Sequence, residues 1–515
     1  MTEPHPGTAA AASPWAVFAT VAIGTFMATL DSSITNVAMP TLARAFAAPG
    51  AVSAPVTLIE WVPLAYLLTI TALLLPFGRM GDRFGRRRVY LGGFCLFTLG
   101  SALCALSRSV EALVAFRVVQ GVGASMAGAN GAALVTQAFP RESRGKALGL
   151  IGAVVGLALT VGPPLGGMLL GLPSGWPTIF LVNLPIGALG VGMALGKLPR
   201  DAPASHAVGA PSASPAPGAP PARPAFDFAG AGLILAALLA FTLGLSRGPT
   251  WGWGSPGTVG LLGATGAGLV LFALVERRSA DPLVDFTFFR SPVFASAVLS
   301  LFLAYAAFFA SIFLVPFYLE RVGGLTPAGV GRVLVVVPLM LLGVSPLSGA
   351  LSDRMGSRTL ASLGLVLTAA GLALLAWMIG RDDGRPASVW AILGGLLVVG
   401  CGQGLFQPPN SSAAMGALPS SRLGLAGGLL AIMRNLGMLT GIAIAASVYE
   451  GREAHYLRTL GRLAATGHGM RDAFLAAAGI AVVGSAVAAG RGRADAVPDA
   501  ASSVARPTQD GLGSA

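Results

Sequence analysis

The chain has 515 residues, of which 54% are hydrophobic and only 10% are charged, and its formal net charge is +12. A soluble domain usually carries about a quarter charged residues, so this composition excludes an ordinary soluble fold. The positive charge comes almost entirely from arginines in short segments between apolar runs, which is typical of a membrane protein and argues against a nucleic-acid partner.

Fourteen apolar runs follow one another along the chain, each close to the length that a helix needs to cross a bilayer. They lie near residues 15–39, 56–77, 89–107, 111–137, 144–170, 177–197, 228–246, 257–276, 293–318, 327–350, 358–379, 388–408, 424–449 and 472–490. The second and fifth runs contain Pro63 and Pro163-Pro164, and such prolines kink membrane helices. We therefore predict an all-α polytopic membrane protein with fourteen transmembrane helices.

The arginines also predict how the helices are oriented. The short loop at 79–88 alone holds five of them, and loops of this kind stay in the cytoplasm. With an even number of helices, both termini are then cytoplasmic. Residues 1–14, 201–226 and 491–515 are poor in core-forming side chains, and we expect a disordered N-terminus, a disordered cytoplasmic linker and a disordered C-terminal tail.

An internal repeat divides the chain. The segment Gly78-Arg-Met-Gly-Asp82-Arg83-Phe-Gly85-Arg86-Arg87 recurs in degenerate form at 349–358, which contains Asp353 and Arg354. The two copies are 349 − 78 = 271 residues apart, whereas two six-helix repeats would place them roughly 200 apart. The linker and two further helices account for the difference. We expect six-helix bundles at 15–200 and 281–490, with two additional helices at 227–280.

The repeated loop has a chemical interpretation. Gly78 and Gly85 permit a tight turn, and Asp82 can accept hydrogen bonds from an arginine or from helix N-terminal amides. The arginines Arg83, Arg86 and Arg87 can anchor the loop at the inner face and lock the two bundles together in one state. The alternative is an ordinary basic cytoplasmic loop.

This loop resembles the signature loop of the major facilitator superfamily. Other segments are similar to the motifs of its fourteen-helix drug:proton antiporter branch: Asp31 to Asn36 and Pro40 in the first helix, Glu60-Trp61 to Tyr66 in the second, Arg117 to Gly123 in the fourth, 176–187 in the sixth, and in the fifth the residues Gly152, Gly156, Gly162, Pro163, Gly166 and Gly167. Glu60 stands where the family commonly has Gln. The resemblance implies a major facilitator fold and proton-coupled efflux of amphipathic small molecules across the bacterial cytoplasmic membrane, by a monomer without cofactor or metal.

Two ionisable residues are the candidates for proton coupling. A carboxylate inside a membrane helix costs about 2.5–3.5 kcal/mol on insertion scales, so Asp31 suggests a compensating role. Arg117 lies at a similar depth in the fourth helix, and the resemblance implies a coupling role for it; its pairing with Asp31 is a hypothesis. A helix-packing carboxylate and an arginine bonded to backbone carbonyls are the structural alternatives. Arg434, in the thirteenth run, is a further candidate.

The remaining candidates are less specific. The fifth-helix glycines can form a flat packing stripe, and the resemblance associates their motif with exporters. Glu60 could attract a cationic substrate in an outer vestibule; the alternative is a solvated helix end. Trp61, Asn36 and Tyr66 are possible substrate or coupling residues.

Three other functions compete with drug efflux. An exporter of a polar metabolite or siderophore would keep the same fold. A non-transporting membrane sensor is also compatible with the helices, but no output domain is recognisable. An ATP-driven pump is excluded within this chain because it contains no G-x4-G-K-[ST] loop.

Overall fold

The computed structural model of the chain describes residues 13–199, 228–278, 286–380, 387–418 and 423–491. The predicted linker at 201–226, most of 1–14 and all but one residue of 491–515 lie outside this part. The described residues form helices, which run in the order α1 (Pro14–Ala45), α2 (Val56–Ile59), α3 (Trp61–Phe84), α4 (Arg86–Ala105), α5 (Val110–Ala138), α6 (Arg141–Leu170), α7 (Thr178–Leu181), α8 (Asn183–Lys197), α9 (Phe228–Trp251), α10 (Pro256–Arg278), the 3-10 turn η2 (Phe286–Arg290), α11 (Pro292–Arg321), α12 (Pro327–Leu334), α13 (Val336–Met355), α14 (Ser357–Ile379), α15 (Val389–Gly416), α16 (Leu423–Tyr456) and α17 (Arg462–Ala489).

The predicted all-α membrane fold is confirmed. Within the described part of the chain, thirteen helical segments are long and apolar enough to cross a membrane, and the shorter apolar segment Gly232–Gly248 of α9 accounts for the remaining predicted run. The last run is longer than predicted, because α17 begins at Arg462.

Three of the predicted runs are interrupted in the same way. The breaks fall at Glu60, Val182 and Val335, between α2 and α3, α7 and α8, and α12 and α13. A proline follows each break three residues later, at 63, 185 and 338. Proline has no N–H and its ring crowds the carbonyl four residues earlier, which weakens the helix at these three positions, although Glu60, Val182 and Val335 keep a helical backbone conformation. By contrast, α6 continues unbroken through Pro163 and Pro164.

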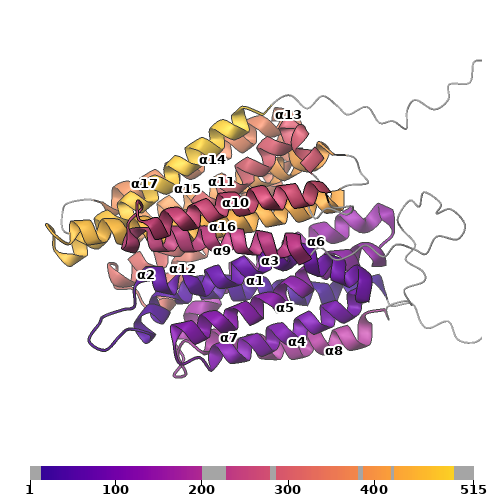
Figure 1. Cartoon of the computed structure of the whole chain (residues 1–515), viewed down its shortest axis with the longest axis horizontal. Coiled ribbons are helices and arrows are strands. Elements are labelled where there is room, and N and C mark those ends of the chain that lie inside the picture. Colours follow the sequence, from indigo (N-terminus) through magenta and orange to yellow (C-terminus); the bar gives the residue numbers. More distant parts are fainter. Residues whose placement is uncertain (1–12, 200–227, 279–285, 381–386, 419–422, 492–515) are drawn as a thin grey trace, which may run out of the picture.

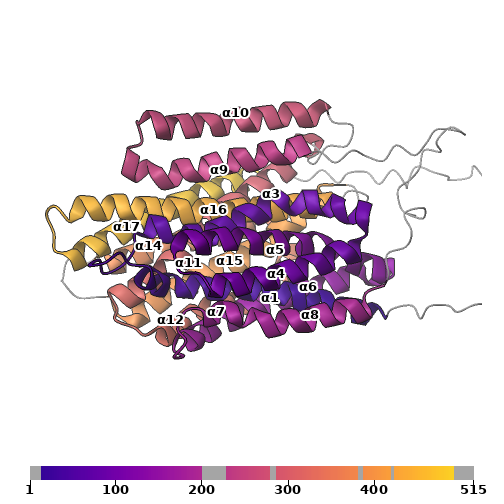
Figure 2. The same cartoon turned by 60° about the horizontal axis from the view of Figure 1, so that its bottom comes forward.

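The helices form two halves and a peripheral pair (Figures 1 and 2). In the first half α1 packs on α6, and α4 and α3 pack on α5; in the second half α14 packs on α15 and α17, and α11 on α16. Helix α9 packs on α3 and α16, while α10 packs on α9 and lies farthest from the two halves. Only 17% of the most apolar window of α10 is buried, against 72% for α11, as expected of a helix that faces lipid.

Side chains and helices of the two halves meet at one end of the helix bundle. We call the end that holds the start of α1 and the end of α17 the terminal face, and the other end the opposite face. At the opposite face Arg44 of α1 forms a 2.5 Å ion pair with Glu320 of α11, and Arg321 donates to Ser53 over 2.9 Å. Helix α6 also packs along α12. The halves are therefore held together at the opposite face.

The predicted C-terminal tail begins one residue too early. Arg491 is only 2% exposed, and its guanidinium donates to Ser296 of α11 over 3.1 Å and to Asn410 of α15. The side chain therefore folds back onto the second half just after α17 ends.

Candidate functional site

The structure brings Asp31 and Arg117 together inside the first half. Asp31 lies midway along α1 and Arg117 one third of the way along α5, and Nη1 of Arg117 is 2.6 Å from Oδ2 of Asp31. Both side chains are fully shielded from solvent. An ion pair this deeply buried needs hydrogen bonds to the remaining polar atoms, because desolvation of both charges is costly.

Three neutral side chains supply those hydrogen bonds. Gln120, three residues after Arg117 and so on the same side of α5, accepts from Nη1 of Arg117 over 2.6 Å and donates to Oδ1 of Asp31 over 2.9 Å. Asn183, the first residue of α8, donates to the same Oδ1 over 2.8 Å. Ser101 of α4 accepts from both amides, over 2.7 and 3.3 Å. Four helices thus contribute to one network.

The break before α8 positions Asn183. Because the chain is interrupted at Val182, α8 starts inside the protein, and its first side chain is fully buried beside Asp31.

Arg117 is held on its other sides by backbone and aromatic groups. Its Nε donates to the carbonyl oxygen of Val62 over 3.1 Å, and its guanidinium lies 4.2 Å from the ring centroid of Tyr66 and 5.7 Å from that of Phe180. Both rings are within cation–π range. Nη2 has no hydrogen-bond partner among the described residues. The guanidinium therefore keeps support, and one free donor, if Asp31 becomes neutral.

Glu60 does not line an outer vestibule, which corrects that expectation. Its side chain is fully buried, because Ser246 of α9 covers it and donates to its Oε1 over 2.6 Å. Trp61 donates to the same serine over 3.2 Å. The peripheral helix α9, which the motifs of the first half do not place here, contributes to removing Glu60 from solvent.

The fifth-helix motif lies against both halves at the opposite face. A Cβ added to Gly162 would overlap Ser33 of α1, and one added to Gly166 would lie 3.2 Å from Ile34. Gly167 faces α12, where a Cβ would lie 2.6 Å from the carbonyl oxygen of Pro327.

The same motif includes residues with other surroundings. The carbonyl of Pro163 contacts Gly331 of α12 so closely that no side chain fits there, and a Cβ on Gly156 would lie 2.8 Å from Leu342 of α13. Gly152 has open space around it. Close helix contact, the packing interpretation, thus describes the end of the motif that lies near the opposite face.

The repeated loop closes the terminal end of the first half. Gly85 has φ +101°, a conformation that glycine adopts without strain, and Gly356 repeats it at +81° in the second copy. Gly78 instead lies within α3, so the turn does not use it. Asp82 accepts from Arg86 over 2.6 Å, and Arg87 donates to the carbonyl of Leu195 in α8 over 2.6 Å.

These contacts join α3, α4 and α8, all of the first half, and the locking of the two halves by this loop stays a prediction. Arg83 lies 5.5 Å from the ring of Phe84 in the same loop. In the second copy Arg354 is exposed, while the Asp353 side chain lies outside the described part.

Two further candidates lie away from the network. Asn36 is buried in α1, five residues after Asp31. Arg434 lies on α16 of the second half, beside Tyr305 of α11, and is not part of the Asp31 network.

Comparison with known proteins identifies the family. The sequence profile of the Major Facilitator Superfamily matches residues 21–226, 225–442 and 297–507 in overlapping segments. The chain belongs to the Major Facilitator Superfamily. Riboflavin transporter RibZ of Clostridioides difficile is 33% identical over 84% of this chain and 88% of its own. Multidrug resistance protein Stp of Mycobacterium tuberculosis is also 33% identical, over 83% and 74% of the two chains.

A third relative is the tetracenomycin C resistance and export protein of Streptomyces glaucescens, 31% identical over 84% of this chain and 75% of its own. These names agree with the drug:proton antiporter branch that the motifs resemble. The chain is thus a transporter of this superfamily and not an enzyme.

Solved structures share the facilitator fold at low sequence identity. A bacterial homologue of the human lysosomal transporter Spinster, in an inward-facing and unoccupied conformation, is 16% identical with a TM-score of 0.66 over 94% of this chain and 97% of its own. The crystal structure of a D-xylose-proton symporter gives 0.64 at 14% identity over 93% and 98%.

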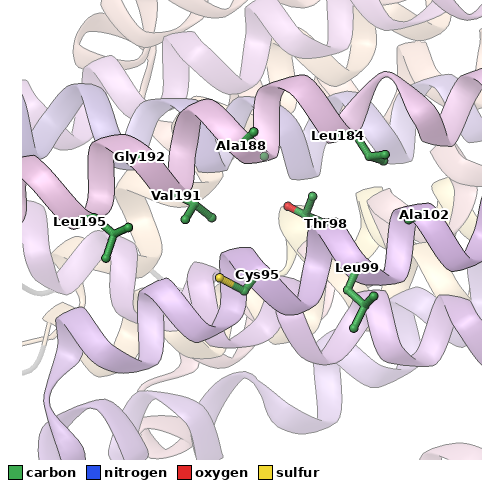
Figure 3. A pocket seen from close by; sticks show the side chains of 10 residues that line it. Cys95, Thr98, Leu99, Ala102, Leu184, Ala188, Val191, Gly192 and Leu195 are labelled. Carbon is green, nitrogen blue, oxygen red and sulfur yellow. The ribbon is translucent and has the colours of Figure 1, made fainter.

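One groove lies on the outside of the facilitator fold. It has a volume of about 580 Å³ and runs between α4 and α8, where Cys95, Thr98 and Leu99 face Ala188 and Val191 (Figure 3). Its walls are apolar and largely exposed on the surface of the first half, so lipid tails are its natural filling. None of the predicted site residues lines it.

Sequence reasoning missed three members of the Asp31 network as site residues. Gln120 and Asn183 lie within recognised motif segments, but neither was assigned a role, and Ser101 was not considered. Each is a polar side chain inside an apolar run, and a buried polar group requires a hydrogen-bond partner. That signal was available, although it does not name the partner.

Proposed function

We propose that this transporter exports amphipathic small molecules from the bacterial cytoplasm in exchange for protons, by alternating access between its two halves. The observation that carries the proposal is the Asp31–Arg117 pair with its ring of Gln120, Asn183 and Ser101. In this pair, the carboxylate of Asp31 can bind and release a proton, and the adjacent guanidinium of Arg117 is attracted to it only while it is charged.

The proposed coupling step is a change of partners. With Asp31 charged, its two oxygens hold Arg117, Gln120 and Asn183, which belong to α5 and α8. A proton on Asp31 removes the attraction to Arg117, whose remaining contacts are the side-chain oxygen of Gln120, the carbonyl of Val62 and the rings of Tyr66 and Phe180. The first half can thereby relax around α1, and α1 contacts α11 and α12 of the second half. Proton binding at Asp31 is in this way linked to the contact that α1 makes between the two halves.

Closure of the halves at the opposite face is compatible with loading of substrate from the cytoplasm. The opposite face, which the arginine distribution predicts to be extracellular, is held by Arg44–Glu320 and by α6 against α12. We assign this arrangement to the state that loads substrate from the cytoplasm. Entry of protons from outside then drives the return to this state after release, and a single chain suffices because each contribution to the network comes from one half.

A second candidate substrate class is a polar, ring-containing metabolite. It is favoured by the riboflavin transporter among the relatives, which matches over 88% of its own length. The fold and coupling site would be unchanged, and only the cargo would differ.

The test uses inside-out membrane vesicles that acidify their lumen by respiration. Ethidium, an amphipathic cation, and riboflavin serve as probes. We expect ethidium to accumulate only while the pH gradient is present, and Asp31→Asn to reduce accumulation to that of vesicles without the transporter. Glu111→Gln, which alters an exposed carboxylate at the start of α5, is the matched control and should leave transport unchanged.

The outcomes separate the alternatives. Ethidium accumulation that survives collapse of the gradient by nigericin would refute proton exchange. Gradient-dependent accumulation in Asp31→Asn equal to that of the unaltered chain would refute the assigned role of Asp31. Transport of riboflavin without ethidium would replace the first substrate class by the second.

A further inference from the structure

Glu60 and its surroundings form a second buried ionisable site, distinct from the Asp31 network. It lies at the break between α2 and α3, and its side chain is fully buried. Oε1 accepts from Ser246, whereas Oε2 is buried and has no hydrogen-bond partner among the described residues. A buried carboxylate anion with one oxygen that accepts no hydrogen bond raises the free energy of the folded state. Binding of a proton neutralises the group and removes that cost.

Ser246 can serve either form of this carboxyl group. A serine hydroxyl donates one hydrogen bond and accepts two. Its oxygen lies 2.6 Å from Oε1 of Glu60 and 3.4 Å from the carbonyl oxygen of Thr57, and it accepts from Trp61. With Glu60 protonated, the carboxyl can donate to Ser246 while Ser246 donates to Thr57, so the serine uses all its capacity. With Glu60 charged, Ser246 must turn its proton to the carboxylate, and the Thr57 carbonyl loses that donor.

Thr57 connects this site to the second half. Its amide donates to one oxygen of Glu450 on α16 over 2.9 Å, and its hydroxyl donates to the other over 2.6 Å. Ser447, one turn earlier on α16, donates to the carbonyl of Leu245 on α9 over 2.6 Å. The first half, the peripheral helix α9 and the second half therefore meet at one point of the opposite face.

The charges around Glu60 make this junction sensitive to its protonation. Glu450 is near enough to repel a negative charge on Glu60. The other charged groups of the helices packed here are engaged elsewhere or exposed. Arg117 and Asp31 pair with each other, Arg44 with Glu320 and Arg452 with Asp472, and Arg321 donates to Ser53. Glu453 accepts from Tyr449 and Thr466, Arg247 of α9 lies over the ring of Trp251 at 5.9 Å, and Glu111 lies at the exposed start of α5. The arginines of α4 lie at its start, on the terminal face.

We propose that Glu60 binds a proton when the two halves close at the opposite face, and that α9 contributes the hydroxyl which makes this site. Loss of the proton places two like charges across the junction and favours its opening. Proton uptake favours closure, which is the direction that proton entry takes in the proposed exchange cycle, so the inference rests on the proposed function. It also gives the peripheral pair α9 and α10 a part in coupling.

The test follows opening directly and needs no substrate. Spin labels are attached at Val52 and Leu457, exposed positions of the first and second halves near the opposite face, in a chain whose three native cysteines are replaced by alanine. Distances between the labels are measured by pulsed electron resonance in lipid nanodiscs between pH 5.5 and 9. We expect the unaltered protein to shift from the short to the long distance as the pH rises.

Variants assign the response. Glu60→Gln, a neutral residue of the same shape, should keep the short distance at high pH. Ser246→Ala, which removes the donor to the charged form, should move the midpoint to higher pH by about one unit. Glu111→Gln should behave like the unaltered protein, and its correct response guards against a general loss of folding in the labelled chain.

Three results would overturn the inference. The first is an unaltered protein without a pH-dependent distance change. The second is a Glu60→Gln variant that titrates as the unaltered protein does. The third is a response that disappears in Asp31→Asn but persists in Glu60→Gln, which would assign it to the Asp31–Arg117 pair. None of these results depends on whether ethidium is exported, so failure here and failure of the proposed function are distinguishable.

Discussion

The Asp31–Arg117 pair should show a large energetic coupling that burial alone explains. The perturbation is a double-mutant cycle with Asp31→Asn and Arg117→Gln, which remove one charge each and keep polar side chains. Either single change leaves the other charge buried without its partner, which costs about 3–5 kcal/mol. Arg117→Gln should be the more harmful of the two, because it also removes the contacts with Tyr66 and Phe180.

The double variant has no unpaired charge, and its loss should be smaller than the sum of the two single losses by at least about 1.5 kcal/mol. The assay is reversible unfolding in mixed micelles with increasing mole fraction of dodecyl sulfate, which yields a free energy of unfolding for each variant. Gradient-driven transport of ethidium should be lost in all three variants, so stability and coupling are measured separately.

An exposed pair of the same length provides the control. Asp82 and Arg86 are also 2.6 Å apart, but their side chains are 59% and 26% exposed. Exposed pairs of this kind couple by about 0.5 kcal/mol or less. If the cycle on Asp31 and Arg117 gave a coupling no larger than the cycle on Asp82 and Arg86, the reasoning from burial would be refuted.

Two further predictions concern backbone positions. Gly331→Ala adds a methyl group where the carbonyl of Pro163 already touches α12, so α6 and α12 should separate; labels at the opposite face should report a longer distance, whereas Gly152→Ala, in open space, should not change it. Gly356→Ala meets no atoms within 4 Å but must adopt φ +81° and ψ 146°, which should lower the free energy of unfolding by about 1–3 kcal/mol; a loss below a few tenths would contradict the prediction.

The helices were predictable because each has to cross a layer of fixed thickness. A run of about 20 apolar residues is required whatever the helix packs against, so the apolar runs located the thirteen long spans and the shorter apolar segment of α9 in the described part of the chain. Helix ends near water were less predictable, since the hydrophobic core no longer constrains them. The start of α17 at Arg462 and the extension of α16 to Tyr456 lie in this region.

The breaks show what local sequence leaves undecided. Proline at 63, 185 and 338 follows an interruption, whereas Pro163 and Pro164 lie inside an unbroken α6. All of these prolines lack the same N–H. Other prolines, at 40, 76, 316, 346, 408 and 409, also lie inside unbroken helices. The carbonyl of Pro163, moreover, packs onto Gly331 of another helix. That contact joins residues far apart in the chain, and no local pattern reports it.

The candidate site was predictable in its charges and not in its neutral members. A buried Asp and a buried Arg inside the membrane each raise the free energy of the protein. Pairing them lowers that cost, so their contact could be expected. A neutral polar side chain can occur singly in a membrane helix at a small free-energy cost. The presence of Gln120, Asn183 and Ser101 in the sequence therefore did not indicate which residue each of them binds. The prediction that Glu60 lies in an outer vestibule was wrong for another reason. Its position near the end of a run indicates an interface with water, but a helix from beyond the linker covers it.

The buried carboxylates Asp31 and Glu60 are connected through the first turn of α3. Arg117 donates to the carbonyl of Val62, two residues after Glu60, and Tyr66, one turn further along α3, lies under the same guanidinium. Movement of Arg117 away from a neutral Asp31 must therefore pull on, or release, the segment that positions Glu60. A rigid helix turn transmits such a shift because its hydrogen bonds do not stretch independently. Protonation of either carboxylate is thus expected to change the affinity of the other for its proton by an equal factor, as linkage requires.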